Sequence, residues 1–160
     1  MIGAYLKRIR KHIGKDMIIL PAARAVIENS QGEILFIERV DNGRLGLPAG
    51  GLEEGETIIE CIIREVKEET GLDVVDPILI GIDSRPDLQT HTYPNGDCVQ
   101  YFVTEFYIRE WSGNLRVEDN LEIKDVSFKS YDSIDDLPEL EKSTFESLRH
   151  FKKYGRPLIR

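Results

Sequence analysis

The chain is predicted to fold as one α/β domain, with a mixed β-sheet and helices on both faces of that sheet. Two observations support this class. The apolar segments follow the order strands, helix, strands, helix, and they all lie within 160 residues. A chain of this length can bury a proper core as a single domain. Because no repeat, low-complexity tract or linker divides it, residues 1–160 are assigned to one domain.

The first segment, residues 1–15, is predicted to be a basic amphipathic helix, since apolar side chains recur there at helical spacing. A helix of this kind can contact membrane or nucleic acid. We expect it instead to pack against the domain or against a second subunit, so that a homodimer is the assembly this surface would allow. Its basic residues are Lys7, Arg8, Arg10, Lys11 and Lys15.

Strands and turns are predicted to follow. Residues 17–27 form an apolar run interrupted by Pro21, which favours a start at a sheet edge. After a turn, residues 34–37 form a second strand, and the two strands are expected to pair as a hairpin. A brief extended stretch at 45–47 leads into the turn Pro48-Ala49-Gly50.

The second half of the chain supplies the remaining elements. Residues 74–82 are predicted to form a strand, and residues 99–108 form the clearest strand because they are rich in aromatic and β-branched side chains. A late strand is expected at 125–128. Ser143 and Glu146 have the spacing of a capping box, which predicts the start of a C-terminal helix.

Residues 50–72 are the most informative about function, because a glycine-rich turn there leads into a helix rich in carboxylates. Glu65, Glu68 and Glu69 have the spacing that places side chains on one face, within about 100° of arc. Like charges at this spacing repel, and they also lie at the C-terminal end, where the helix dipole disfavours them. A cation between them removes both penalties and adds oxygen–metal contacts, so the pattern predicts a divalent-metal site.

The other sides of this helix are expected to have structural roles. Arg64 stands beside the glutamates and is placed to orient one of them by a bidentate contact, and Gly71 closes the helix. The predicted core stripe is Ile59, Ile62, Ile63 and Val66. The predicted solvent face is Glu56, Glu60 and Lys67.

The segment resembles the Nudix box, G-x5-E-x7-R-E-U-x-E-E-x-G-U, in which U is a bulky aliphatic residue. Every defined position is filled, and such a long signature with fixed spacing is far more specific than a lone glycine motif. The resemblance implies a MutT-like hydrolase with an α/β/α sandwich, in which the box forms a loop–helix–loop at the sheet edge. The matching residues are Gly50, Glu56, Arg64, Glu65, Val66, Glu68, Glu69, Gly71 and Leu72.

The resemblance also implies hydrolysis of a nucleoside diphosphate linked to another moiety, with water attacking one phosphorus. Phosphoryl transfer depends on positioned water and neutralised charge, and Mg²⁺ supplies both, with Mn²⁺ as the expected substitute. We assign Glu65 and Glu69 as metal ligands, with Glu68 as a third. The backbone carbonyls of Ala49 and Gly50 are additional ligands by resemblance.

The catalytic set implied by the resemblance is Glu68, Arg64 and Glu122. The general base in this family lies within the box or on a later loop, which makes both Glu68 and Glu122 candidates. Glu122 ends the acidic stretch 118–122, and its other interpretation is a solvated loop acid. A base must lie within hydrogen-bond reach of the attacking water, which sequence alone does not reveal.

Substrate contacts are expected from three further residues. Arg39 resembles a phosphate-contacting position, with an ordinary surface arginine as the alternative. Arg44, on the loop before the box, is placed to touch the base or the ribose. Tyr93, within a polar stretch, is placed to stack on a base.

For the substrate itself, ADP-ribose or another sugar nucleotide is favoured over a nucleoside triphosphate. This preference depends on Pro86 and on the turn at 48–50, which resemble features of ADP-ribose-cleaving members. Pyrophosphohydrolysis of nucleoside triphosphates, including oxidised ones, stays open as an alternative. So do a non-catalytic Nudix-like nucleotide sensor and a Nudix-fold isomerase acting on a prenyl diphosphate.

Composition limits the other partners. The net charge of −8 argues against a large nucleic-acid interface, because phosphate backbones need basic surfaces. No apolar run reaches membrane-spanning length, no signal-peptide pattern opens the chain, and two cysteines make no disulfide framework. We therefore expect a small-molecule nucleotide as partner, no nucleic acid or membrane, and a cytoplasmic location.

Overall fold

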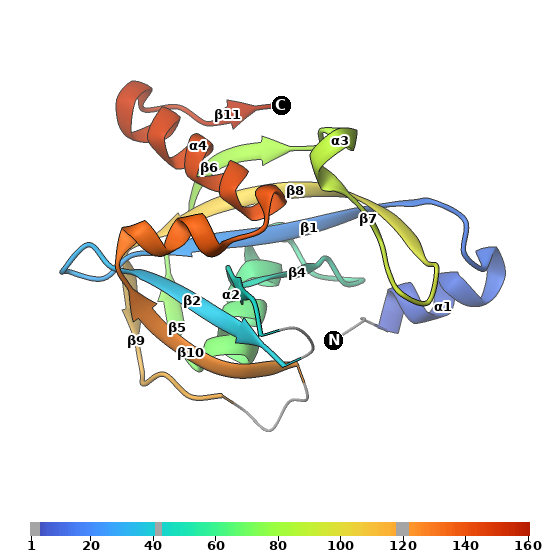
Figure 1. Cartoon of the computed structure of the whole chain (residues 1–160), viewed down its shortest axis with the longest axis horizontal. Coiled ribbons are helices and arrows are strands. Elements are labelled where there is room, and N and C mark those ends of the chain that lie inside the picture. Colours follow the sequence, from blue (N-terminus) through green and yellow to red (C-terminus); the bar gives the residue numbers. More distant parts are fainter. Residues whose placement is uncertain (1–3, 41–42, 118–121) are drawn as a thin grey trace.

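The strands form one mixed sheet and two smaller ones, in a computed structural model that describes residues 4–40, 43–117 and 122–160 (Figure 1). In the main sheet the strand order is β11-β6-β8-β1-β4, and β7 pairs with β8. β8 runs parallel to β1 along its full length, whereas β4 pairs with β1 over Ala22–Arg24, so β1 begins at an edge as Pro21 predicts. The strands are β1 (Ile18–Ile27), β4 (Ala49–Gly51), β6 (Ile78–Asp83), β7 (Thr90–Thr92), β8 (Cys98–Ile108) and β11 (Leu158–Ile159).

The expected hairpin between the first two strands is wrong. A single bridge joins Glu28 to Ile34, after which β2 leaves β1 and pairs with the distant β10 from Ile34 to Arg39. This longer antiparallel ladder outweighs the local pairing that the turn would allow. The smaller sheets contain β2 (Ile34–Arg39), β3 (Leu45–Gly46) and β10 (Ile123–Lys129), and β5 (Asp73–Val75) with β9 (Glu110–Ser112).

The strand predicted at 74–82 is in fact two strands in different sheets. β5 ends at Val75, and β6 begins at Ile78. Between them Asp76 has a positive φ of 47°, and Pro77 has no backbone N–H to donate to a ladder. The chain therefore changes direction here, and the two halves join β9 and β8 respectively.

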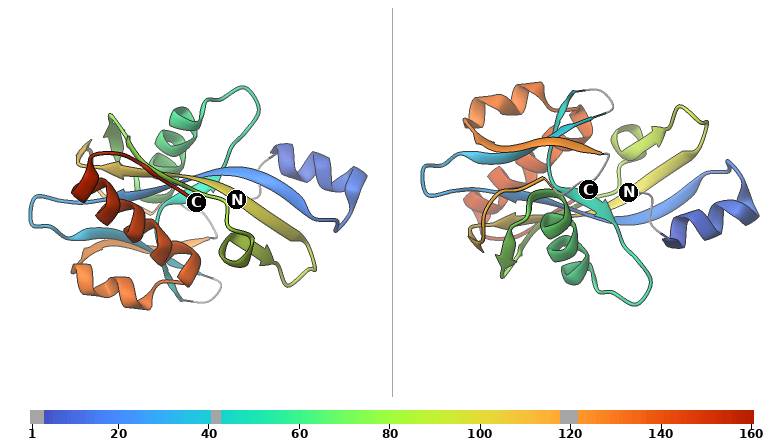
Figure 2. Two further views of the ribbon diagram at one scale, coloured as in Figure 1. Left: turned by 90° about the horizontal axis from the view of Figure 1, so that it is seen from above. Right: turned by 90° about the horizontal axis from the view of Figure 1, so that it is seen from below.

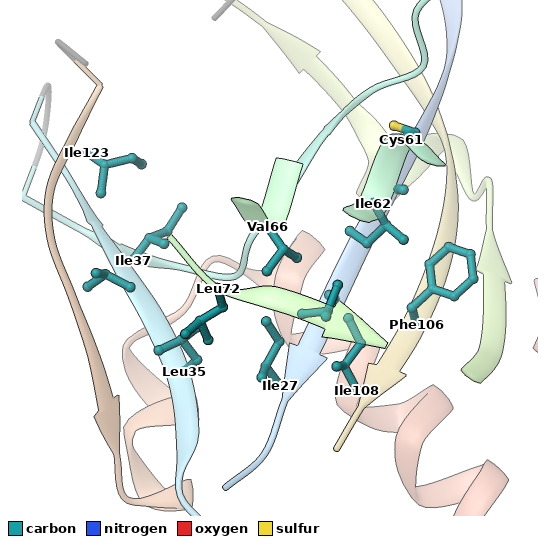
Figure 3. Close-up of a cluster of buried hydrophobic side chains, with 14 residues drawn as sticks. Ile27, Leu35, Ile37, Cys61, Ile62, Val66, Leu72, Phe106, Ile108 and Ile123 are labelled. Carbon is teal, nitrogen blue, oxygen red and sulfur yellow. The ribbon is translucent and has the colours of Figure 1, made fainter. Parts of the chain in front are cut away.

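Helices α2 (Ile58–Thr70) and α4 (Glu139–Tyr154) cover opposite faces of the main sheet, as Figure 2 shows. The alternation along β1 explains this. Ala25 and Ile27 belong to the cluster around α2, whereas Val26 between them packs with Phe145 and Leu148 of α4. Figure 3 shows the α2 cluster, which β2 and β10 complete from the side. The predicted α/β/α arrangement is confirmed.

Local sequence signals fix both ends of α2. Thr57 is the N-cap: its hydroxyl accepts from the backbone N–H of Glu60, and the Glu60 carboxylate accepts from the backbone N–H of Thr57 at 2.7 Å. Gly71 ends the helix with a left-handed φ of 79°. The predicted core stripe is wrong at Ile59, which is 39% exposed; the residues that α2 buries are Cys61, Ile62, Val66 and Thr70.

The start of α4 differs from its prediction. Ser143 is no N-cap; the helix begins at Glu139 after Pro138, and the Ser143 hydroxyl donates to the carbonyl of Leu140 within the helix. Shorter helices are α1 (Ala4–Ile13), α3 (Pro86–Gln89) and the 3₁₀ helix η1 (Tyr131–Asp136).

The N-terminal helix is confirmed over its described residues, Ala4–Ile13. It buries none of its residues and projects beside the starts of β1 and β8 (Figure 1). Polar contacts join it to the domain, such as Arg10 donating to the carbonyl of Cys98 at 2.8 Å. Over the described ranges, none of the helices has the length and apolar character needed to cross a membrane.

Candidate active site

The turn at Leu47–Gly51 and the C-terminal half of α2 meet at the edge of the main sheet, and this contact depends on a glycine. An added Cβ at Gly50 would lie 1.9 Å from both Cδ and Oε1 of Glu65. Such an approach is impossible for any other residue unless Glu65 moves. The carboxylate of Glu65 therefore lies directly against the peptide backbone of the turn.

Glu69 lies one helical turn further along and faces the same backbone. Its Oε2 accepts a hydrogen bond from the N–H of Ala49 at 3.0 Å. Burial, with the nearby charge of Glu65, raises the pKa of Glu69 to about 8, although Arg39 and the Ala49 N–H act in the opposite direction. Burial likewise raises the pKa of Glu65, and Arg64 opposes that shift.

Arg64 holds these groups in place through several contacts. Its Nε and Nη2 donate to the two carboxylate oxygens of Glu56 at 3.0 and 2.7 Å, and its Nη1 donates to Oε1 of Glu65 at 2.6 Å. Its Nη2 also donates to the carbonyl of Gly51 at 3.2 Å. The predicted orienting role is therefore visible, but its bidentate partner is Glu56, and only one bond goes to Glu65.

The position predicted for Glu56 on the solvent face is wrong. Its side chain is half-buried, and besides Arg64 it accepts from the N–H of Glu53 at 2.8 Å. The hydrogen bonds from Arg64 are the main cause that lowers the pKa of Glu56. Glu56 therefore stays charged and serves as the fixed anchor of Arg64.

Glu68 lies on the outer side of this cluster. Its side chain is 57% exposed, and its Oε2 lies 3.6 Å from Nη1 of Arg64. Among the described residues, no three acidic, histidine or cysteine side chains already converge as metal ligands. What the structure brings together is two carboxylates, Glu65 and Glu69, against the Ala49–Gly50 backbone.

This donor set fits a divalent cation of the Mg²⁺ class. Oxygen atoms are the ligands that such ions prefer, and Mg²⁺ keeps several of its own waters, so two carboxylates and neighbouring carbonyls are enough. The space at Gly50 that a Cβ would fill is occupied by a carboxylate oxygen of Glu65, an atom that can bind a metal ion. A cation would also remove the repulsion that raises the pKa of Glu69.

The family is decided by comparison with known proteins. A family model for the NUDIX domain matches residues 19–151, most of the chain. The chain belongs to the Nudix family. Together with its hydrolase relatives, this match shows a Nudix pyrophosphohydrolase.

Two relatives match this Nudix chain over most of its length. An ADP-ribose pyrophosphatase of Methanocaldococcus jannaschii is 33% identical over 159 residues, covering 95% of this chain and 85% of the relative. The nucleoside triphosphatase NudI of an Enterobacter species is 30% identical, covering 75% and 89%. The crystal structure of a MutT protein from Bacillus halodurans has a TM-score of 0.66 at 24% identity, over 88% of this chain and 86% of that one.

Arg39 and Glu122 both lie where the ladder of β2 and β10 ends in this Nudix domain. The register pairs Arg39 with Ile123, and the N–H of Val40 donates to the carbonyl of Glu122 at 2.8 Å. The positive charge of Arg39 lowers the pKa of Glu69 against the effect of burial, so Arg39 also lies near Glu69. Glu122 is exposed, and the rest of its acidic stretch, residues 118–121, lies outside the described residues.

The other two predicted substrate contacts are further from the box. Arg44 is exposed on the loop between β2 and β3, where its carbonyl accepts from the N–H of Arg39 at 3.0 Å. Tyr93 packs edge-on against His91, and its hydroxyl is hydrogen-bonded to that of Tyr101. Tyr93 is therefore linked to Tyr101 of β8.

Sequence reasoning missed Tyr101, although the two-residue alternation of side chains along a strand could have indicated which residues share its face. Residues 101, 103, 105 and 107 of β8 alternate onto one face, and Tyr101 lies on the same face as Arg24. Burial raises the pKa of Tyr101, while Arg39 and Arg24 act to lower it, so both guanidinium groups are nearby. Arg39 is therefore near both Glu69 of the box and Tyr101.

Glu105 of β8 is a structural residue. Its carboxylate is fully buried and accepts from Thr144 at 2.9 Å and from Ser147 at 2.5 Å. The guanidinium of Arg160 lies 3.4 Å away. These contacts fasten α4 to β8, so Glu105 does not face the site.

Proposed function

We propose that this Nudix pyrophosphohydrolase is Mg²⁺-dependent and cleaves a nucleoside diphosphate linked to another moiety. The observation that carries the proposal is the packing of Glu65 and Glu69 against the Ala49–Gly50 backbone. Two anionic carboxylates beside backbone oxygens form a site for a hard cation, and Glu68 completes the set from the outer side. When bound, Mg²⁺ would neutralise phosphate charge and lower the pKa of a coordinated water.

The residues of the chain have distinct tasks in this proposal. Glu65, Glu69 and the carbonyls of Ala49 and Gly50 would hold the ion. Arg64 keeps Glu65 in its position through the fixed ion pair with Glu56. Because Arg64 makes these contacts within the protein, its catalytic contribution would be positioning and electrostatic, with no direct proton transfer.

In this proposal the substrate contacts come from Arg39, Arg44 and the linked tyrosines Tyr93 and Tyr101. Arg39 would bind a phosphate group of the substrate beside the metal ion, since its guanidinium lies close enough to shift the pKa of Glu69. The linked tyrosines Tyr93 and Tyr101 would contact the base or ribose. Arg44, on the rim, would approach the same end of the substrate.

Two residues are candidates to accept the proton of the attacking water. Glu68 has an exposed carboxylate within the box. Glu122 lies at the end of the β2–β10 ladder, where its carbonyl accepts from the N–H of Val40. A general base typically contributes about 10²–10⁴-fold to the rate, so removal of the true base would be unmistakable.

ADP-ribose or another sugar nucleotide is the proposed substrate class. Support comes from the relative named an ADP-ribose pyrophosphatase, which this chain matches over nearly its whole length. The reaction would add one water across the pyrophosphate bond, yielding AMP and ribose 5-phosphate. A nucleoside triphosphate is the second candidate because of the similarity to NudI, and it would yield a nucleoside monophosphate and pyrophosphate.

A product assay tests both candidates. The protein is incubated with Mg²⁺ and a panel of ADP-ribose, other sugar nucleotides, normal nucleoside triphosphates and oxidised ones, and the products are quantified. We expect AMP and ribose 5-phosphate from ADP-ribose, and no turnover when EDTA is added. Turnover of triphosphates alone would favour the second candidate. Tight nucleotide binding without any turnover would favour the nucleotide sensor.

Three statements stay predictions. Composition predicts a cytoplasmic location and no nucleic-acid or membrane partner, and the N-terminal helix predicts a possible homodimer. The helix leaves its residues unburied within one chain, which is the surface a second copy would cover. Gel filtration with light scattering at high protein concentration tests the dimer, and a single monomer peak would contradict it.

A further inference from the structure

Behind the turn that carries Ala49 and Gly50, the protein buries a pair of opposite charges that the Nudix box does not include. Arg24 of β1 and Glu141 of α4 are each only 5% exposed. Charged side chains are almost never buried this deeply unless they have partners. Their contacts lead directly to the proposed metal site.

Glu141 holds the backbone of the turn. Its Oε2 accepts from the N–H of Leu47 at 2.5 Å, across 94 residues of sequence. The following residue, Pro48, has no N–H, so Leu47 is the last backbone donor before Ala49. The Ala49 N–H in turn donates to Glu69 at 3.0 Å. One carboxylate from α4 and one from α2 therefore hold two successive donors of the same short segment.

The same segment is fixed to β1 as well. The carbonyl of Pro48 accepts from the N–H of Ala25 at 2.9 Å, and Ala49 pairs with Arg24 in the β1–β4 register. Arg24 then donates through Nη1 to the carbonyl of Leu140 at 2.6 Å. Arg24 thereby anchors the first turn of α4, which contains Glu141, to β1. β1 is the strand that pairs with Ala49 of the Leu47–Gly51 turn.

Glu141 also lies beside the proposed phosphate ligand. An added Cβ at Gly46 would lie 3.3 Å from Oε2 of Glu141 and 3.4 Å from Nε of Arg39. The two side chains therefore flank the same glycine. A shift of Glu141 would disturb both the turn and the surroundings of Arg39.

We propose that Glu141 is a positioning residue of the active site, which holds the Leu47–Ala49 backbone so that the metal ligands of the turn and Glu69 keep their geometry. This inference rests on the proposed metal-dependent function. Outer partners that orient metal ligands typically change metal affinity by about 10–100-fold when removed. We therefore expect Glu141→Ala to weaken divalent-metal binding at least about tenfold.

The first test measures Mn²⁺ binding by calorimetry and, separately, the Mg²⁺ concentration that half-saturates turnover. Glu141→Ala removes the acceptor, whereas Glu141→Gln keeps an oxygen that can accept from Leu47 N–H. We expect weakened Mn²⁺ binding and a raised Mg²⁺ requirement in Glu141→Ala, with near-normal values in Glu141→Gln. Glu139→Ala is the matched control, because Glu139 lies in the same helical turn with a 76% exposed side chain.

Three results would overturn the inference: wild-type metal binding in Glu141→Ala, equal losses in the alanine and glutamine variants, or an equal loss in the control. If Glu141→Ala does not fold, Gly46→Ala provides the test with Glu141 still present. Its Cβ would press on Oε2 of Glu141 and on Arg39, so Mn²⁺ binding should weaken, and unchanged binding would refute the proposal.

The experiment separates this inference from the proposed function. If wild-type protein binds Mn²⁺ but cleaves no pyrophosphate, the proposed activity is wrong, and the binding comparison still tests Glu141. If the wild type is active and the variants bind Mn²⁺ equally, the activity stands and the role of Glu141 is refuted.

Discussion

Replacing Glu69 by glutamine should stabilise the metal-free protein while abolishing its function. The glutamine has nearly the same volume, and its side-chain oxygen can still accept from the Ala49 N–H. What it lacks is a charge that the folded protein accommodates poorly. Burial and the charge of Glu65 raise the pKa of Glu69 to about 8, against an ordinary value of 4.5. Ionised Glu69 therefore costs stability.

The sign and size of this effect follow from proton linkage. Between pH 4.5 and 8 the folded state binds the Glu69 proton more tightly than the unfolded state, so the stability of the metal-free protein falls as the pH rises through this window. One pKa unit corresponds to about 1.4 kcal/mol. The carboxylate keeps some contact with water, and we therefore expect a penalty of about 2 kcal/mol at pH 8. Glu69→Gln should remove it.

Urea unfolding provides the assay. In EDTA at pH 8, Glu69→Gln should be more stable than wild type by about 2 kcal/mol, and the difference should disappear near pH 4.5. Saturating Mg²⁺ should reverse the order, because a ligand at 100 times its Kd stabilises the wild type by about 2.7 kcal/mol. Turnover should fall by orders of magnitude. A variant that is less stable than wild type in EDTA, or that keeps wild-type turnover, would refute this reasoning.

Further predictions concern the turn, the phosphate contact and the base. Gly50→Ala should raise the Mg²⁺ requirement at least about tenfold, because its Cβ would displace the Glu65 carboxylate; Gly51→Ala, whose Cβ makes an ordinary 3.4 Å contact with Leu20, is the control, and equal effects would contradict the account. Arg39→Ala should raise KM for ADP-ribose about tenfold with little change in Mn²⁺ affinity, measured by calorimetry. An unchanged KM would mean that Arg39 is an ordinary surface arginine without a substrate contact. Of Glu68→Gln and Glu122→Gln, the variant of the true base should lose about 10²–10⁴-fold in kcat and lose the fall in rate at low pH, while keeping its Mg²⁺ half-saturation; a loss of metal affinity instead would identify a ligand.

The parts of the fold that sequence predicts well are those in which all the interacting residues are close in the chain. Thr57, Glu60 and Gly71 define α2 through contacts within one or two turns. The aromatic and β-branched residues of 99–108 likewise define a strand. The hairpin prediction failed because the partner of β2 is β10, roughly ninety residues away, and no local signal competes with such a ladder.

The same distinction explains the start of α4. Ser143 and Glu146 have capping-box spacing, but the helix extends four residues further toward the N-terminus, to Glu139. That first turn is held by Arg24, which donates to Leu140 from 116 residues away. A clue was present, since Glu141 falls on the stripe of Phe145 and Leu148, where a buried carboxylate would be expected only with a partner.

Helical-wheel reasoning found the carboxylates of the site but misplaced one of them. Glu65 and Glu69 do share a face, and the structure brings both to the turn. Glu56 was assigned to the solvent face by extending the same angles backward. The helix begins at Ile58, so those angles do not apply to Glu56, and its side chain is free to turn inward to Arg64.

The geometry of the site therefore depends on residues that its signature does not contain. The box provides carboxylates, an arginine to orient one of them, and a glycine against which a carboxylate packs. None of these holds the turn from its other side. That contact comes from Glu141 on α4, which Arg24 anchors to β1, and both are buried far from the box in sequence. Because these contacts are buried and internal, we expect the turn to keep its position even when the repelling carboxylates lack a cation, so that the folded protein can hold a site that is locally unfavourable.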